Sequence, residues 1–184
     1  MGKSWNSVRK MLEEDFLCEK LRGRVQYFFT IYHNAPDQYG RFAVRVDGKE
    51  IYQANPYNES YSNKLLNKLH EKENIPHRLW NGKEFVFDEE CIKIEEKASL
   101  MAIADGKADS YIVINSIMEY INTPIEKALS SENYVLRMLA VMDRRVGKRT
   151  LSKLAEDFLC LPEWLKRFYR LRFMVEGIQG GENE

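Results

Sequence analysis

The chain has 184 residues, in which lysine plus arginine equal aspartate plus glutamate at 28 each, so the formal net charge at pH 7 is zero. This balance disfavours nucleic-acid binding through overall charge and leaves only local basic patches for such a role. Hydrophobic residues make up 44% of the chain and aromatic residues 12%. That content supports a real core, in one domain or two lobes sharing a core, and excludes a disordered chain.

The cysteines indicate a reducing compartment. Cys18, Cys91 and Cys160 are odd in number, far apart and without a CxxC pair, which is typical of reduced thiols that serve as small core residues. The N-terminal segment lacks the apolar region of a secretory signal, and no apolar run approaches the ~20 residues that span a bilayer. We therefore predict a cytoplasmic protein without a membrane partner.

The N-terminal part predicts a helix followed by an antiparallel sheet. Apolar residues recur at helical spacing over 4–21, and Ser4 is suited to cap this helix. The period then changes to two, which predicts strands over 25–31 and 42–46. Proline and glycine in the segment 35–40 predict a turn between these strands.

Asp47-Gly48 is the strongest hairpin signal in the chain, because a two-residue type I′ loop needs a positive φ at both positions. Closing this loop places Val44 opposite Ile51 on the inner face. It also places Arg45 opposite Glu50, with opposite charges, on the outer face. We therefore expect a three-stranded meander with the first helix packed on one face.

Most of the remaining chain predicts helices. Thr123 to Glu126 has the pattern of a capping box with proline at the first helical position. Gly147 is expected to end the helix before it, and Thr150 to cap the helix after it. Asn81-Gly82 predicts a short hairpin. The expected helices cover 60–72, 89–104, 109–121, 124–129, 132–146, a segment after Thr150, and a last helix from Pro162.

These elements define an α+β protein. We expect a helix-plus-sheet lobe over 1–87, a helical lobe of short αα-hairpins over 88–178, and a flexible tail over 179–184. Short links between the helices are also compatible with a HEAT-like stack, although no period repeats clearly.

The most marked stretch is the basic run Arg144, Arg145, Lys148 and Arg149 around Gly147. Helix N-termini attract anions, so cations beside the start of the next helix are compatible with an anion or phosphate site. The alternative is structural, because the same cations complement the negative end of the preceding helix. Both interpretations remain open from the sequence.

The last helix adds Arg167 and Arg170 to this basic surface. Residues 137–172 hold ten Lys/Arg against four Asp/Glu, a local excess that can steer an acidic partner. Asp143 and Arg172 each lie on the flank of an apolar stripe. We predict that these two form a partly buried ion pair that braces their helices.

Catalytic and metal-binding patterns are weak. His33, His70 and His77 have no second ligand at a metal-binding spacing, so neither a metal nor another cofactor is expected. No Ser/His/Asp or Cys/His grouping has a motif context, and we predict no catalytic residues. The acidic segment 88–96 could support a hydrolase that uses paired carboxylates, but acids are also favoured at a helix start.

Four segments together resemble a family of uncharacterised bacterial proteins. The segments read WNSVRKMLEEDFLCEKLRGRVQY, GRFAVRVDGKEI, LAVMDRRVGKRTL and FYRLRFMVEGI. The last two carry the most specific marks, LAxxDRRxGKRxL and FYxLRxxxEGI. The resemblance spans most of the chain, is least over 55–120, and implies a bacterial cytoplasmic protein without assigning an activity.

Three functions follow as hypotheses. The first is a non-enzymatic binding or adaptor protein that uses the basic surface of the helical lobe on an acidic protein partner. The second is binding of RNA or a phosphate ligand at the turn 144–149. The third is a hydrolase that uses the acidic residues 88–96.

Overall fold

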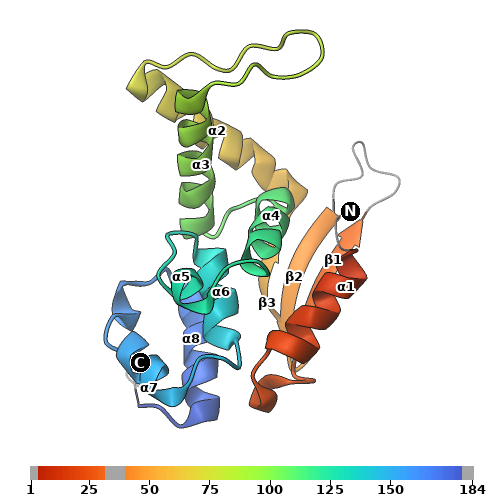
Figure 1. Ribbon diagram of the computed structural model, residues 1–184, viewed down its shortest axis with the longest axis vertical. Coiled ribbons are helices and arrows are strands. Elements are labelled where there is room, and N and C mark those ends of the chain that lie inside the picture. The colour runs from red at the N-terminus through yellow and green to blue at the C-terminus, as the bar shows by residue number, and fades with distance from the viewer. Residues whose placement is uncertain (1–3, 32–39, 180–184) are drawn as a thin grey trace.

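A computed structural model describes residues 4–31 and 40–179 of the chain. An N-terminal helical segment and a three-stranded sheet lie on one side of the molecule, and helices occupy the other side (Figure 1). This confirms the predicted α+β class. The turn predicted at 35–40 and the tail predicted at 179–184 lie almost wholly outside the described residues. No helix in the described part of the chain is long and apolar enough to cross a membrane.

The N-terminal helix is shorter and more irregular than the sequence predicts. The α-helix α1 covers Trp5–Lys10, and the Ser4 hydroxyl accepts a hydrogen bond from the Ser7 amide, as a cap should. The chain continues as the π-helix η1, Met11–Phe16, and the 3₁₀-helix η2, Glu19–Leu21. The predicted single helix over 4–21 is therefore wrong. It breaks at Leu17, whose extended backbone forms a β-bridge with Asp143.

The sheet follows the predicted meander in the order β1-β2-β3, all antiparallel. Its strands are β1 (Val25–Ile31), β2 (Gly40–Val46) and β3 (Lys49–Ala54). The loop between β2 and β3 has the positive φ angles that the hairpin signal requires, 50° at Asp47 and 78° at Gly48.

The predicted register of this hairpin is confirmed on one face only. Arg45 pairs with Glu50 as predicted, but Val44 pairs with Tyr52 and not with Ile51, because a bulge interrupts the ladder between Val44 and Arg45. A bulge adds one residue to a strand and changes which side chains share a face. Tyr52 therefore enters the core, 5% exposed, while Ile51 is only half-buried at the sheet edge.

The helical half begins with η4 (Pro56–Asn58) and α2 (Glu59–Glu73). It continues with α3 (Glu89–Ala104), α4 (Ser110–Tyr120), α5 (Ile125–Leu129), α6 (Tyr134–Met142), α7 (Lys148–Leu154), η5 (Phe158–Cys160) and α8 (Glu163–Glu176). The predicted capping box is wrong, since the Thr123 hydroxyl donates to the Glu119 carbonyl and no side chain caps α5.

Helix α6 forms the centre of the core. The predicted apolar stripe of α6 is buried, and so are Leu136, Ala140 and Val141 on its other sides. Helices α3, α4, α5 and α8 all pack on α6, whereas a HEAT-like solenoid stacks successive pairs. A helix surrounded in this way is apolar on nearly all sides, and Arg137 is the one charged residue of α6. The same core includes residues of α1 and the sheet.

A long connection between α2 and α3 extends away from the rest of the molecule (Figure 1). We call residues 77–88 the arm. Only one β-bridge forms there, between Trp80 and Phe85, instead of a regular hairpin. The Asn81 side chain accepts hydrogen bonds from the amides of Lys83 and Glu84 and closes the turn. The arm carries large apolar side chains in solvent: Leu79, Trp80, Phe85, Val86 and Phe87.

Candidate functional site

The basic run at 144–149 lies in a turn between α6 and α7 that is joined to the N-terminal segment. Helix α6 ends at Asp143, whose backbone is extended. The Arg144 amide donates to the Phe16 carbonyl at 2.7 Å, and the Cys18 amide donates to the Met142 carbonyl at 3.0 Å. The helix therefore stops where it meets the end of η1, and the prediction that Gly147 ends it is wrong.

Asp143 is the centre of a buried polar cluster, with an exposed fraction of 1%. Its carboxylate accepts a hydrogen bond of 2.6 Å from the Tyr120 hydroxyl. It also accepts bonds from the Arg145 amide at 2.8 Å, from Nε at 3.0 Å and from Nη2 at 2.7 Å. Buried charges are stable only when they are paired and hydrogen-bonded in this way.

These contacts assign Arg145 a structural role. Its guanidinium lies 4.9 Å from the centre of the Phe16 ring as well as against Asp143. Hydrogen bonding to Asp143 raises the pKa of Arg145. Burial and the charge of Asp143 raise the pKa of Tyr120, which keeps that hydroxyl protonated as a donor. Of the four predicted cations at 144–149, Arg145 is thus the one held by a carboxylate.

The predicted ion pair between Asp143 and Arg172 is wrong, although both side chains are buried. Arg172 donates instead to the Val146 carbonyl at 2.9 Å and to Glu176 at 2.6 Å. Both residues hold the same turn, Asp143 through Arg145 and Arg172 through the Val146 carbonyl. The flank positions correctly indicated burial, but Arg145 is only two residues from Asp143 and reaches it at lower entropic cost.

The end of α8 is held by a second charged cluster. Lys20 donates to Glu176 at 3.0 Å and to the Val175 carbonyl at 2.8 Å, from the other end of the chain. Burial alone would raise the pKa of Glu176, but hydrogen bonding to Lys20 and the charge of Arg172 outweigh it, and the pKa is lowered. Glu176 is therefore an anchor between the N-terminal segment and α8.

Arg144, Lys148 and Arg149 are the other three cations of the basic turn, and all three are exposed. Their side chains form no hydrogen bond or ion pair with other residues in the described ranges 4–31 and 40–179. They are the part of the predicted basic run that remains accessible to a ligand.

Gly147 gives a test of this turn. Its φ of −82° and ψ of 166° make it the N-cap of α7, where no side chain caps the helix, and an added Cβ would meet nothing within 4 Å. We expect Gly147→Ser to increase the free energy of unfolding by about 0.5–1 kcal/mol, through a new cap and a less flexible unfolded chain. Urea unfolding measures this change. If Gly147 were instead a left-handed glycine at the end of α6, the serine would lower the free energy of unfolding.

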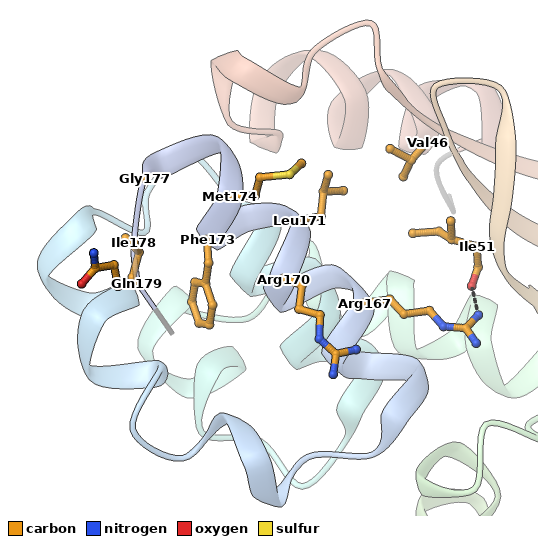
Figure 2. Close-up of a pocket in the computed structure, with 10 residues that line it drawn as sticks. All are labelled: Val46, Ile51, Arg167, Arg170, Leu171, Phe173, Met174, Gly177, Ile178 and Gln179. Atoms are coloured by element: carbon orange, nitrogen blue, oxygen red, sulfur yellow. Dashed lines mark hydrogen bonds between the residues drawn. The ribbon is translucent and has the colours of Figure 1, made fainter. Parts of the chain in front are cut away.

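Arg167 and Arg170 lie elsewhere, on a groove between α8 and the β2–β3 hairpin (Figure 2). Arg167 donates to the Ile51 carbonyl at 3.3 Å, which places its guanidinium across one end of the groove. Arg170 pairs with Glu163 at 2.7 Å and lies over the Phe158 ring. None of the exposed cations of the basic turn lines this groove, so the predicted site residues are split between two places.

The rest of the groove is largely apolar, and the sequence did not indicate it. It has a volume of about 660 Å³. Its lining residues besides the two arginines are Val46, Ile51, Leu171, Phe173, Met174, Gly177, Ile178 and Gln179. Met174 is 65% exposed. The sequence signal for the groove was Met174, which follows Arg170 by four positions and therefore shares one face of α8 with it.

The face of α8 that enters the core also differs from the prediction. Leu165, Tyr169 and Phe173 are buried together with Phe168, whereas the predicted Leu171 and Val175 are only half-buried. The core face is therefore rotated from the predicted stripe, which leaves Leu171 and Met174 to form a wall of the groove.

Three of the five acids in the segment 88–96 are engaged in local structure. Asp88 caps α3 through the Cys91 amide, and Glu95 forms a two-pronged ion pair with Arg78. Glu89 pairs with Lys93 one turn later. Among the residues that the structure describes, no three or more His, Cys, Asp or Glu side chains gather in a metal-binding arrangement.

The fold and these sites define a class: an α+β protein in which a small antiparallel sheet packs against helices that surround one central helix, with an apolar groove rimmed by arginines. The chain belongs to the SF0329 protein family, which matches residues 4–173 and is uncharacterised. This agrees with the resemblance to an uncharacterised family. No curated protein and no solved structure matches the chain.

Proposed function

We propose that this protein is a binding protein that captures an apolar, acidic segment of a polypeptide in the groove along α8. The observation that carries the proposal is the combination of an apolar lining with two guanidinium groups at the rim. Exposed apolar surface of this kind marks interaction sites. Arginine and methionine are both enriched in protein interfaces.

The chemistry of the occupant follows from the rim. Arg167 has five N–H donors, and its hydrogen bond to the Ile51 carbonyl uses one nitrogen. The others can bind a carboxylate, which a planar guanidinium holds through two bonds. Arg170 is partly neutralised by Glu163, so Arg167 is the stronger anchor for an acidic group. Met174 and Leu171 can adapt to an apolar side chain beside it.

The test is peptide selection on the full chain. A random phage-displayed peptide library is selected on the wild type, and enriched peptides are measured by fluorescence anisotropy. We expect peptides that combine acids with large apolar residues, and at least about tenfold weaker binding to Arg167→Glu and to Met174→Asp. The matched control is Arg149→Glu, an exposed cation outside the groove, which should bind normally. Equal binding to Met174→Asp would refute the groove as the site.

A second candidate function is RNA or phosphate binding at the basic turn. It is favoured by the exposure of Arg144, Lys148 and Arg149, whose side chains form no hydrogen bond or ion pair in the described parts of the chain, although the charge of Lys148 helps to lower the pKa of Glu176. Phosphate contacts weaken steeply with salt, by a slope close to the number of neutralised phosphates. Filter retention measures the affinity for single-stranded RNA at several salt concentrations. We expect the salt dependence of the wild type to be lost in the triple variant Arg144→Ala, Lys148→Ala, Arg149→Ala. The hydrolase alternative gains no supporting observation from the described residues.

A further inference from the structure

We propose that the segment that fills the α8 groove is the arm, residues 77–88, of a second copy of this chain, in a reciprocal dimer. The inference rests on the proposed binding function and names its partner. Each protomer would insert its arm into the groove of the other and receive the other arm in return.

The arm is built to present apolar side chains to a partner. Phe87 is 78% exposed, Leu79 74%, Trp80 58% and Phe85 56%. Monomeric proteins seldom leave so many large side chains in solvent on one segment. These residues would be covered if the arm entered an apolar groove.

The arm is also held in shape, which distinguishes it from a random loop. The Trp80 and Phe85 rings pack edge to face, with centres 5.1 Å apart. Arg78 lies over the Phe85 ring while its guanidinium is bound by Glu95 of α3. A segment that is ordered before binding loses less conformational entropy when it docks.

The charges of arm and groove are complementary. The arm and the first two residues of α3 contain the acids Glu84, Asp88, Glu89 and Glu90 against the cations Arg78 and Lys83, and Arg78 is neutralised by Glu95. Asp88 caps α3 and Glu89 pairs with Lys93, so Glu84 and Glu90 are the carboxylates free to meet Arg167 and Arg170. The arm thus has the chemistry that the groove requires, acidic groups beside large apolar side chains.

The two features lie toward opposite ends of the molecule. The arm extends beyond α2 and α3 at one end, while the groove lies along the C-terminal half of α8 toward the other end (Figure 1, Figure 2). An arm therefore meets a groove on another copy and not its own. Two chains related by a two-fold axis satisfy both contacts at once and close the assembly.

The contact area of the two arms and grooves would come close to that of a specific dimer. A whole aromatic side chain buries about 150–250 Å², so the exposed parts of six rings from two arms amount to several hundred Å². The groove walls that cover them lose a similar area. Together the two contacts approach the total of about 1,200–2,000 Å² that specific interfaces bury.

The experiment exchanges the charges of the two partners in the full chain. One variant carries Arg167→Glu and Arg170→Glu in the groove, and the other carries Glu84→Lys in the arm and Glu90→Lys at the start of α3. Light scattering after size exclusion measures the oligomeric state, and thermal melting checks that each variant folds. We expect a wild-type dimer, and at least about tenfold weaker dimerisation for each variant alone.

Mixing the two variants gives the decisive result, because in the heterodimer each acidic arm meets an arginine groove and each lysine arm meets a glutamate groove. We expect the mixture to recover a dimer. A wild type that is monomeric up to about 100 μM, or a mixture that stays monomeric, overturns the proposal. If the selected peptides still bind the groove of such a monomer, the binding function stands and only the occupant is wrong. If they do not bind, both proposals fail.

Discussion

Asp143→Ala is expected to lower the free energy of unfolding by about 3 kcal/mol. The substitution removes a fully buried carboxylate and leaves the Tyr120 hydroxyl and the Arg145 amide without their acceptor. Losing one member of a buried charged pair costs about 3–5 kcal/mol when both members are deeply buried. The Arg145 side chain is 40% exposed, so water can solvate it after the change, and the loss falls toward the lower end.

Urea unfolding followed by circular dichroism measures this loss. The matched control is Asp15→Ala, which removes an exposed carboxylate of the nearby helix η1 and should change the free energy by less than about 0.5 kcal/mol. Tyr120→Phe should cost about 1–2 kcal/mol alone and much less in the Asp143→Ala background. Additive losses would mean that the two residues do not act through their shared bond.

Substitutions of Arg145 and Arg144 test the contribution of the arginines to the same cluster. Arg145→Ala is expected to destabilise the protein by about 1 kcal/mol, since it removes a partly exposed ion pair and the stacking on Phe16. Arg144→Ala should change stability little, because the exposed Arg144 side chain forms no hydrogen bond or ion pair with another described residue. Equal effects of the two changes would contradict the division between structural and free cations.

Gly40→Ala is expected to cost about 2–3 kcal/mol of unfolding free energy through overpacking. A Cβ at this position would lie 2.6 Å from the Thr30 carbonyl oxygen and 2.8 Å from the Phe29 ring. The carbonyl belongs to the backbone of the paired strand β1, so it cannot move aside without disturbing the ladder. The Phe29 ring in turn packs edge to face against Trp5 of α1.

Gly23→Ala is the matched control for Gly40→Ala. Gly23 has a φ of 77°, and a Cβ there would meet nothing within 4 Å. Its substitution should cost about 1–2 kcal/mol through backbone strain alone. It should leave near-ultraviolet dichroism from the aromatic cluster unchanged, whereas Gly40→Ala should alter that signal. A Gly40→Ala protein with wild-type stability and dichroism would contradict the close contact.

Local signals predicted the local structure well. The Asp47-Gly48 loop, the three strands and the helices over 60–72 and 89–104 were all predictable, because the residues that specify them are adjacent in the chain. The predicted capping box at 123–126 is wrong because the Thr123 hydroxyl has a competing acceptor one turn earlier, the Glu119 carbonyl.

The candidate sites were predictable only in part. Sequence reasoning found the basic residues, but it could not divide them, because the division depends on the side chains of distant segments. Arg145 is occupied because Asp143 binds its guanidinium, the Phe16 ring lies against it, and Tyr120 donates to the same carboxylate. The groove could not be predicted because it depends on the bulge that turns Ile51 toward the sheet edge and on the rotation of the core face of α8.

The sequence by itself determined the α+β class, the order of strands in the meander, the burial of Asp143 and Arg172, and the membership of an uncharacterised family. Each of these depends on patterns within a few residues or on a match along the chain. The tertiary structure alone decided where α6 ends, which partner each buried charge takes, and which apolar side chains remain outside the core. These depend on long-range contacts, which balance desolvation against pairing and have no signature in local spacing.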